Sequence, residues 1–353
     1  MVARRLAWLT LALALLLPVP PAGAQGVGTQ TLNFEPPVHK PIQVVRVGTR
    51  DFLLVANVSD DSVEVYDTAG PNFLFHVPTG QAPVTIAVRP TATAGGGREI
   101  YTANWLGDSI TVFELFPSSP GLGFRLITTE PVGDEPIGLA FLPENPAEPA
   151  TLPGGPFHEL LFVTFSSKSQ WGVFTPGTVL PVSSALELLD PNGGFGVKDP
   201  RTIAFAPVTA GTFNQMWILN HRGGNDPAVY DFDLWGTTNT TTSISTTRAW
   251  ARPPRHPQAP LPVTQPTDGV TYADGSRVFV TGFNSDTLAA IRPTAGAPST
   301  WSVARVNLAP ANAISVLNPT GAMRGPRGLA LQARTTTPTA GDRLYVYNRV
   351  ETQ

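Results

Sequence analysis

The chain has 353 residues, of which 42% are hydrophobic, and its formal net charge at pH 7 is −3. It contains no cysteine, which excludes disulfide bonds, thiolate metal sites and the lipid anchor of bacterial lipoproteins. The mild acidity, without a basic stripe, argues against nucleic acid as a partner.

The beginning of the chain has the features of a secretory signal peptide. Arg4 and Arg5 precede an apolar run over residues 6–17, and the small residues Ala-Gly-Ala at 22–24 form a signal-peptidase cleavage site. The apolar run is shorter than the roughly 20 residues that span a bilayer. We therefore expect residues 1–24 to be cleaved and the mature protein to be periplasmic or extracellular, without a membrane span.

A pair of short apolar strands then recurs six times. The first strands of these units begin at Pro41, Pro83, Pro136, Pro200, Thr267 and Pro326. The second strands lie at residues 54–57, 101–104, 162–165, 217–220, 279–282 and 345–348. Third and fourth strands follow in several units, as at residues 62–67 and 72–77. Repeats of about 40 to 50 residues that consist of short strands predict the four-stranded blades of a β-propeller.

The repeat predicts an all-β fold over residues 38–353, with six or seven four-stranded blades. Residues 25–37 are expected to supply a ring-closing strand. The last unit has its first two strands, but the sequence stops at Gln353 before a third, so we expect this blade to be incomplete in the chain. Insertions rich in Pro, Gly or Thr at residues 144–157 and 236–263 are expected to be surface loops.

Three of these strands resemble a known repeat family. Residues 345–348 (Tyr-Val-Tyr-Asn), 101–104 (Tyr-Thr-Ala-Asn) and 62–67 (Ser-Val-Glu-Val-Tyr-Asp) are similar to the YVTN-type β-propeller repeats of secreted bacterial and archaeal proteins. The resemblance implies the propeller fold over roughly residues 38–353. The family includes surface propellers, binding proteins and modules joined to c-type haem domains. This chain departs from the haem-linked members because it has no cysteine for haem attachment.

Ionisable residues gather at the predicted start of the first strands. The residue expected to open each first strand is, in chain order, Ile42, Val84, Ile137, Arg201, Asp268 and Arg327. These residues are expected to surround one mouth of a central channel, with Asp268 between the two arginines. Further residues expected at this end are Lys40, Glu135, Asp199 and His221. Two interpretations stay open, namely a solvated rim of ion pairs and a pocket for a small polar or anionic ligand.

No motif for catalysis or metal binding accompanies these residues. The five histidines have no metal-binding spacing, and the sequence lacks a Gly-x-Ser-x-Gly elbow, a phosphate-binding loop and a zincin motif. Asp61, Asp108 and Asp286 each follow a second strand, where we expect them to cap the turn. We therefore predict no catalytic residue, metal site or cofactor from the sequence.

The leading hypothesis is a non-catalytic secreted or periplasmic propeller that binds a protein or a small polar or anionic ligand at the channel mouth. One alternative is a metal-dependent hydrolase or lactonase of the propeller type, with a metal held by acids and amides at that mouth. Another is an accessory module of a haem-based redox system. Retained Ca²⁺ or Mg²⁺ together with lactone hydrolysis favours the hydrolase, and co-purification with a haem protein favours the redox module.

Overall fold

The structure is a computed structural model, and its described residues all belong to the unit Pro36–Gln353. They are residues 39–70, 72–119, 121–141, 161–167, 170–174, 199–207, 214–221, 228–232, 266–272, 276–282, 287–292, 302–307, 326–332 and 339–348. The predicted signal peptide, the segment 25–37 and both predicted loop insertions lie outside these ranges. Within them the regular structure is β-strand without helix, so no helix there is long and apolar enough to cross a membrane.

The strands form antiparallel sheets, which we call blades 1 to 6 in chain order. Blade 1 contains β1 (Ile42–Val47), β2 (Arg50–Asn57), β3 (Ser62–Asp67) and β4 (Asn72–Pro78). Blade 2 contains β5 (Pro83–Val88), β6 (Arg98–Asn104), β7 (Ser109–Ser118) and β8 (Gly121–Pro131). Blade 3 contains β9 (Pro136–Phe141), β10 (Leu161–Phe165) and β11 (Gln170–Phe174).

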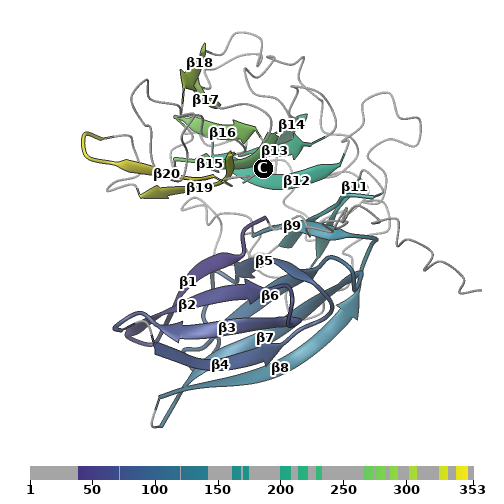
Figure 1. Ribbon diagram of the computed structural model, residues 1–353, viewed down its shortest axis with the longest axis vertical. Helices are drawn as coiled ribbons and strands as arrows, with labels where there is room; N and C mark the ends of the chain where they lie inside the picture. The colour runs from purple at the N-terminus through teal and green to yellow at the C-terminus, as the bar shows by residue number, and fades with distance from the viewer. Residues whose placement is uncertain are drawn as a thin grey trace, which may run out of the picture. The chain divides into compact units, whose positions relative to one another are not determined.

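The second half of the chain repeats this arrangement. Blade 4 contains β12 (Pro200–Pro207), β13 (Asn214–Asn220) and β14 (Ala228–Phe232). Blade 5 contains β15 (Pro266–Thr271), β16 (Val278–Gly282), β17 (Thr287–Arg292) and β18 (Ser302–Asn307), and blade 6 contains β19 (Pro326–Gln332) and β20 (Arg343–Asn348). In every blade, strands that follow one another in sequence are neighbours in the sheet, as Figure 1 shows for β1 to β4. The prediction of an all-β fold that repeats short antiparallel sheets is confirmed.

Apolar side chains on the sheet faces join successive blades. In β2 the buried residues alternate, with Phe52, Leu54 and Ala56 facing inward, as expected for a strand with one buried face. They belong to a cluster that continues into blade 2 through Ile100 and Phe113. Similar clusters join blade 2 to blade 3 and blade 4 to blade 5. Because blade 2 is covered on both faces, β6 and β7 are buried along most of their length.

The aspartates after the second strands cap turns, as predicted. Asp61 accepts a hydrogen bond from the Ala82 backbone N–H (2.7 Å), and Asp108 accepts one from that of Glu135 (2.9 Å). Both aspartates have a positive φ, 48° and 45°, which Asp tolerates better than most residues. Each carboxylate thus ties the turn of one blade to the residue that precedes the first strand of the next. Asp286 lies outside the described residues.

The start of the first strand follows one pattern in blades 2 to 6. A proline opens the strand opposite the last residue of the second strand, and the pairing then shifts at a β-bulge. In blade 5 this proline is Pro266, opposite Gly282, so the predicted start at Thr267 is wrong by one residue. In blade 1, the Pro41 carbonyl accepts a hydrogen bond from Ala56 N–H (2.7 Å). Pro41 therefore aligns with Thr85, opposite Ala103, and not with Pro83.

Candidate ligand site at the start of the first strands

The strand register defines two sets of equivalent residues at this end of the blades. The rim position is the residue that follows the opening position, and in blades 2 to 6 it holds Val84, Ile137, Arg201, Thr267 and Arg327. In blade 1 we assign it to Lys40, the residue before Pro41, because Pro41 aligns with Thr85. The inner position is the next residue, and it holds Pro41, Thr85, Gly138, Thr202, Asp268 and Gly328.

This register corrects the predicted ring of channel-mouth residues. Lys40 replaces Ile42 at the rim position of blade 1, and Thr267 replaces Asp268 in blade 5. Lys40 is thus at the rim position itself, whereas Glu135 and Asp199, which were expected at the same end, each lie two residues before that position in their own blades. The reason is the β-bulge and the different placement of the proline, because a slip of one residue moves a side chain to the other face of a strand. The corrected rim position carries three cationic residues and no acidic one.

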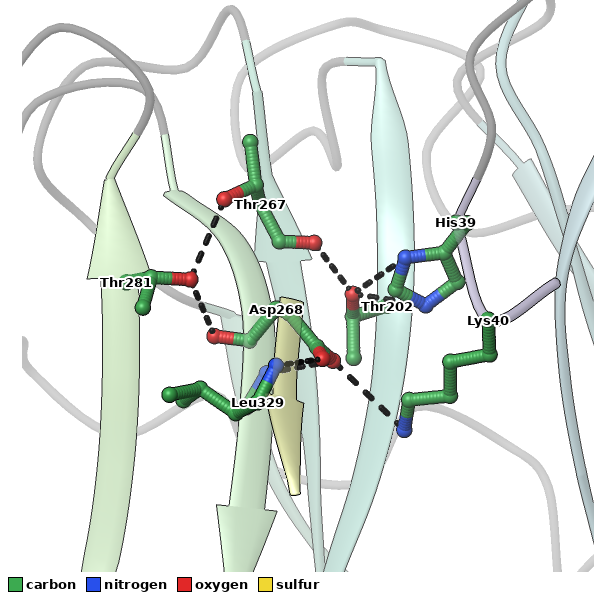
Figure 2. Close-up of polar contacts among 8 residues, drawn as sticks. His39, Lys40, Thr202, Thr267, Asp268, Thr281 and Leu329 are labelled. Atoms are coloured by element: carbon green, nitrogen blue, oxygen red, sulfur yellow. Dashed lines mark hydrogen bonds and ion pairs between the residues drawn. The ribbon is translucent and has the colours of Figure 1, made fainter. Parts of the chain in front are cut away.

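Neighbouring first strands touch at these positions. Thr202 Oγ1 of β12 donates to the Thr267 carbonyl of β15 (2.6 Å), and Leu329 N–H of β19 donates to Asp268 Oδ2 (2.8 Å). Residues 39 and 40 lie along β5, where His39 N–H donates to the Val84 carbonyl (3.0 Å) and the Lys40 carbonyl accepts from Ile86 N–H (3.1 Å). Figure 2 shows how the side chains of His39 and Lys40 point to β12 and β15.

His39 is a neutral hydrogen-bond donor in this cluster. Its Nε2 lies 2.9 Å from Thr202 Oγ1, whose single proton is already directed to the Thr267 carbonyl. His39 therefore donates from Nε2, which fixes the tautomer. The ring is 7% exposed, and burial, with Lys40 and Arg201 as further causes, holds the pKa of His39 well below its usual value. Both cations are thus close enough to act on this ring.

Asp268 is buried below the rim. Its side chain is 2% exposed, whereas that of Lys40 is 31% exposed, and Lys40 Nζ lies 3.5 Å from Asp268 Oδ1. The backbone N–H groups of Gly269 and Leu329 each donate to this carboxylate at 2.8 Å. Burial raises the pKa of Asp268, and Lys40 together with the two N–H groups opposes that rise. Among the described residues, Lys40 is the cation that compensates the buried negative charge of Asp268.

The other predicted residues have partners closer to their own turns. Arg201 forms a two-point contact with Asp199, with both N–O distances at 3.2 Å. Asp268 therefore lies beside Lys40, and Arg201 lies beside Asp199. The place of Asp268 between two arginines stays a prediction. Arg327 occupies the rim position of β19, and its side chain lies outside the described part of the structure.

Glu135 and His221 lie in turns at the same end of their blades. Glu135 Oε2 accepts a hydrogen bond from Ser166 Oγ (2.6 Å), and His221 N–H donates to the Asp199 carbonyl (2.9 Å). Ala82, Glu135 and Asp199 all precede the opening proline and share a positive φ of 57°, 53° and 49°. These residues shape the turn around the rim position, and they are not at that position themselves.

The structure brings together the predicted residues Lys40, Arg201 and Asp268, and it adds His39, Thr202 and Thr267, which were not expected at the site from the sequence. Thr202 and Thr267 link the histidine to two blades, and their signal in the sequence was their place after Pro200 and Pro266. Among the described residues, no group of three or more His, Asp or Glu side chains is placed to hold a metal ion. The exposed parts of Lys40 and Arg201, 31% and 22%, offer positive charge to a solute.

Comparison with known proteins supports the fold. No family model and no curated protein matches the sequence. Among solved structures, hydrazine synthase of Kuenenia stuttgartiensis is similar, with a TM-score of 0.53 and 19% identity over 84% of this chain and 71% of the other. A candidate 6-phosphogluconolactonase of Bacteroides uniformis has a TM-score of 0.50 and 16% identity over 82% of this chain and 74% of the other. Both are β-propeller-type folds, and so is this chain.

Proposed function

We propose that this chain is an exported, non-catalytic β-propeller that binds a small anionic ligand at the rim position. The observation that carries the proposal is the strand register, which gives Arg201 and Arg327 equivalent places in blades 4 and 6, together with Lys40, which precedes Pro41 in blade 1 and whose Nζ lies 3.5 Å from Asp268 Oδ1. The rim position of blades 2 and 3 holds the apolar residues Val84 and Ile137, which are fully buried, so the exposed groups at this position are the cations. A small number of convergent polar or charged groups orients the ligand in small-molecule sites.

The electrostatics support an anion over a cation as the ligand. Lys40 follows His39 and Arg201 precedes Thr202, and the His39–Thr202 contact at 2.9 Å brings both cations to one region. Both cations accordingly lower the pKa of His39. The carboxylates nearest to them, Asp268 and Asp199, are only 2% and 7% exposed, whereas the cations are partly exposed. A solute therefore meets the cations first. Because both cations have internal partners, an anion competes with a carboxylate for each, and we expect a moderate affinity that falls with salt.

Titration of the mature chain with sulfate and with succinate tests the proposal. We expect saturable binding at low ionic strength, measured by calorimetry. The variants Lys40→Met and Arg201→Met should each weaken binding by about 10- to 100-fold, since each removes a charge-assisted contact of about 1.5–3 kcal/mol. Circular dichroism confirms that each variant is folded.

The matched control is Arg46→Met. Arg46 lies toward the other end of β1, is 67% exposed and pairs with Asp51 (2.7 Å), so its removal takes one positive charge from the surface without touching the rim. Binding by this variant should equal that of the wild type. Equal loss in Arg46→Met and Lys40→Met, or no saturable binding of either anion, contradicts the proposed site.

The same preparation separates the two alternative functions. Hydrolysis of a lactone that depends on added Ca²⁺ or Mg²⁺ would favour the metal-dependent hydrolase. Retention of the chain on a haem protein from the same cell compartment would favour the redox accessory module. The similarity to the two solved structures supports the fold alone and does not choose between these functions.

A further inference from the structure

We infer that Asp268 couples anion binding at the rim to the uptake of one proton, because the anion draws Lys40 away and the buried carboxylate is then protonated. The inference rests on the proposed function and concerns the regulation of that same site. It makes the site a proton-linked receptor, which binds its anion more tightly as the pH falls.

The geometry lets Lys40 move while Asp268 stays in place. Lys40 Nζ is 3.5 Å from Asp268 Oδ1, but its side chain is 31% exposed and has a long flexible stem. Asp268 is 2% exposed, and the N–H groups of Gly269 and Leu329, from two different strands, hold its carboxylate. An anion above the rim therefore attracts the ammonium group outward, and the carboxylate cannot follow.

Loss of the lysine leaves a buried carboxylate with two neutral donors. An ionised carboxylate away from water and without a cation is costly, so the group takes up a proton instead. Burial already raises the pKa of Asp268, and Lys40 is the largest influence against that rise. The negative charge of the ligand acts in the same direction as the loss of the lysine.

Among the charged groups around Asp268 whose side chains the structure describes, none replaces Lys40. On the segment before β1, His39 is neutral because its pKa is lowered. On β12, Arg201 is paired with Asp199. On β19, Arg327 holds the rim position, one residue before Gly328. On β15 itself, residues Pro266–Thr271 include no charged residue besides Asp268.

The sign and size of the coupling follow from linkage. If binding raises the pKa of Asp268, the bound form holds more protons than the free form, so the affinity increases as the pH falls through the window between the two pKa values. Each unit of that rise corresponds to about a tenfold change in affinity across the window. Removal of a neighbouring opposite charge shifts a carboxyl pKa by about 1–3 units, so we expect at least a tenfold change.

Calorimetric titration of the mature chain with sulfate tests the coupling, because sulfate stays ionised near neutral pH. Titrations at constant ionic strength between about pH 5 and pH 8, in buffers of different ionisation enthalpy, give the number of protons taken up. For the wild type we expect uptake and a rising affinity toward low pH. Asp268→Asn should abolish the uptake and bind sulfate at high pH as tightly as the wild type does at low pH.

Two further variants keep the result decisive. His39→Gln should retain the proton uptake, which separates Asp268 from the other titratable group beside Lys40. If Asp268→Asn does not fold, proton uptake retained in His39→Gln still shows that His39 is not the group that takes up the proton. Asp51→Asn, a surface carboxylate paired with Arg46, is the control and should behave as the wild type.

The outcomes distinguish this inference from the proposed function. Sulfate binding without proton uptake, uptake that persists in Asp268→Asn, or uptake that disappears in His39→Gln overturns the coupling and leaves the anion site standing. Absence of sulfate binding by the wild type at every pH overturns the anion site and the coupling together.

Discussion

Replacement of Thr202 by valine tests the hydrogen-bond chain that links the segment before β1 to blades 4 and 5. Valine keeps the shape of threonine but removes the hydroxyl, which accepts from His39 Nε2 at 2.9 Å and donates to the Thr267 carbonyl at 2.6 Å. His39 Nε2–H then remains buried without this acceptor, and an unsatisfied buried group costs about 1–3 kcal/mol. We expect Thr202→Val to lower the free energy of unfolding by about 1–3 kcal/mol.

Thr85→Val is the matched control. Thr85 occupies the same inner position in blade 2 and is also fully buried, but its Oγ1 has no hydrogen-bond partner among the described residues. Loss of this hydroxyl leaves no group unsatisfied, so the variant should be as stable as the wild type, within about 0.5 kcal/mol, or more stable. Urea unfolding of the three proteins at neutral pH measures the difference. If Thr202→Val costs no more than Thr85→Val, the hydrogen-bond chain does not stabilise the fold.

Three further predictions follow from the fold, the pKa of His39 and the N-terminus. A Cβ on Gly138 would lie 2.5 Å from the Arg201 carbonyl oxygen, so Gly138→Ala should destabilise by about 1–3 kcal/mol in urea unfolding, whereas Gly121→Ala, with open space around it, should not. Because the pKa of His39 is lowered in the folded state, the unfolded state binds the proton first, and the free energy of unfolding should fall as the pH drops below about 6.5. Urea midpoints measured from about pH 8 to pH 5 should show this fall for the wild type, and His39→Gln should reduce it. Intact-mass measurement of exported protein should show cleavage after Ala24, and a mature N-terminus at Met1 or Val2 contradicts the predicted signal peptide.

The strands could be predicted from the sequence because their signals are local. The alternation of apolar residues over Ser62–Asp67, and the asparagine that ends β2, β6, β13 and β20, lie within single hairpins. The pairing of Asn57 with Ser62 and of Asn104 with Ser109 repeats the same turn in two blades. An alternation or turn pattern that involves only residues close in sequence can be recognised without knowledge of the fold.

The site could be predicted only in part because its geometry depends on register and on distant partners. The sequence pattern aligns the Asp-Gly pair at residues 268–269 with the Arg-Gly pair at 327–328. The opening prolines Pro266 and Pro326 show instead that Thr267 is the residue equivalent to Arg327. A β-bulge hides such a shift, because it adds a residue without changing the apolar pattern of the strand. His39 and Thr202 are separated by 163 residues, and no local pattern signals that they touch.

Among the inner-position residues of the described blades, Asp268 of blade 5 costs the most free energy to bury. Blades 2 and 4 carry threonine there, and blades 3 and 6 carry glycine, so the packing of the first strands does not require a charge. A carboxylate at the same place must be taken out of water, and one lysine at 3.5 Å with two backbone donors only partly offsets that cost. Buried ionisable groups whose pKa is shifted by burial and a specific charge are more frequent at functional sites than elsewhere. The contrast between Asp268 and its threonine equivalents is therefore the feature of this chain that most directly supports the proposed site at the rim.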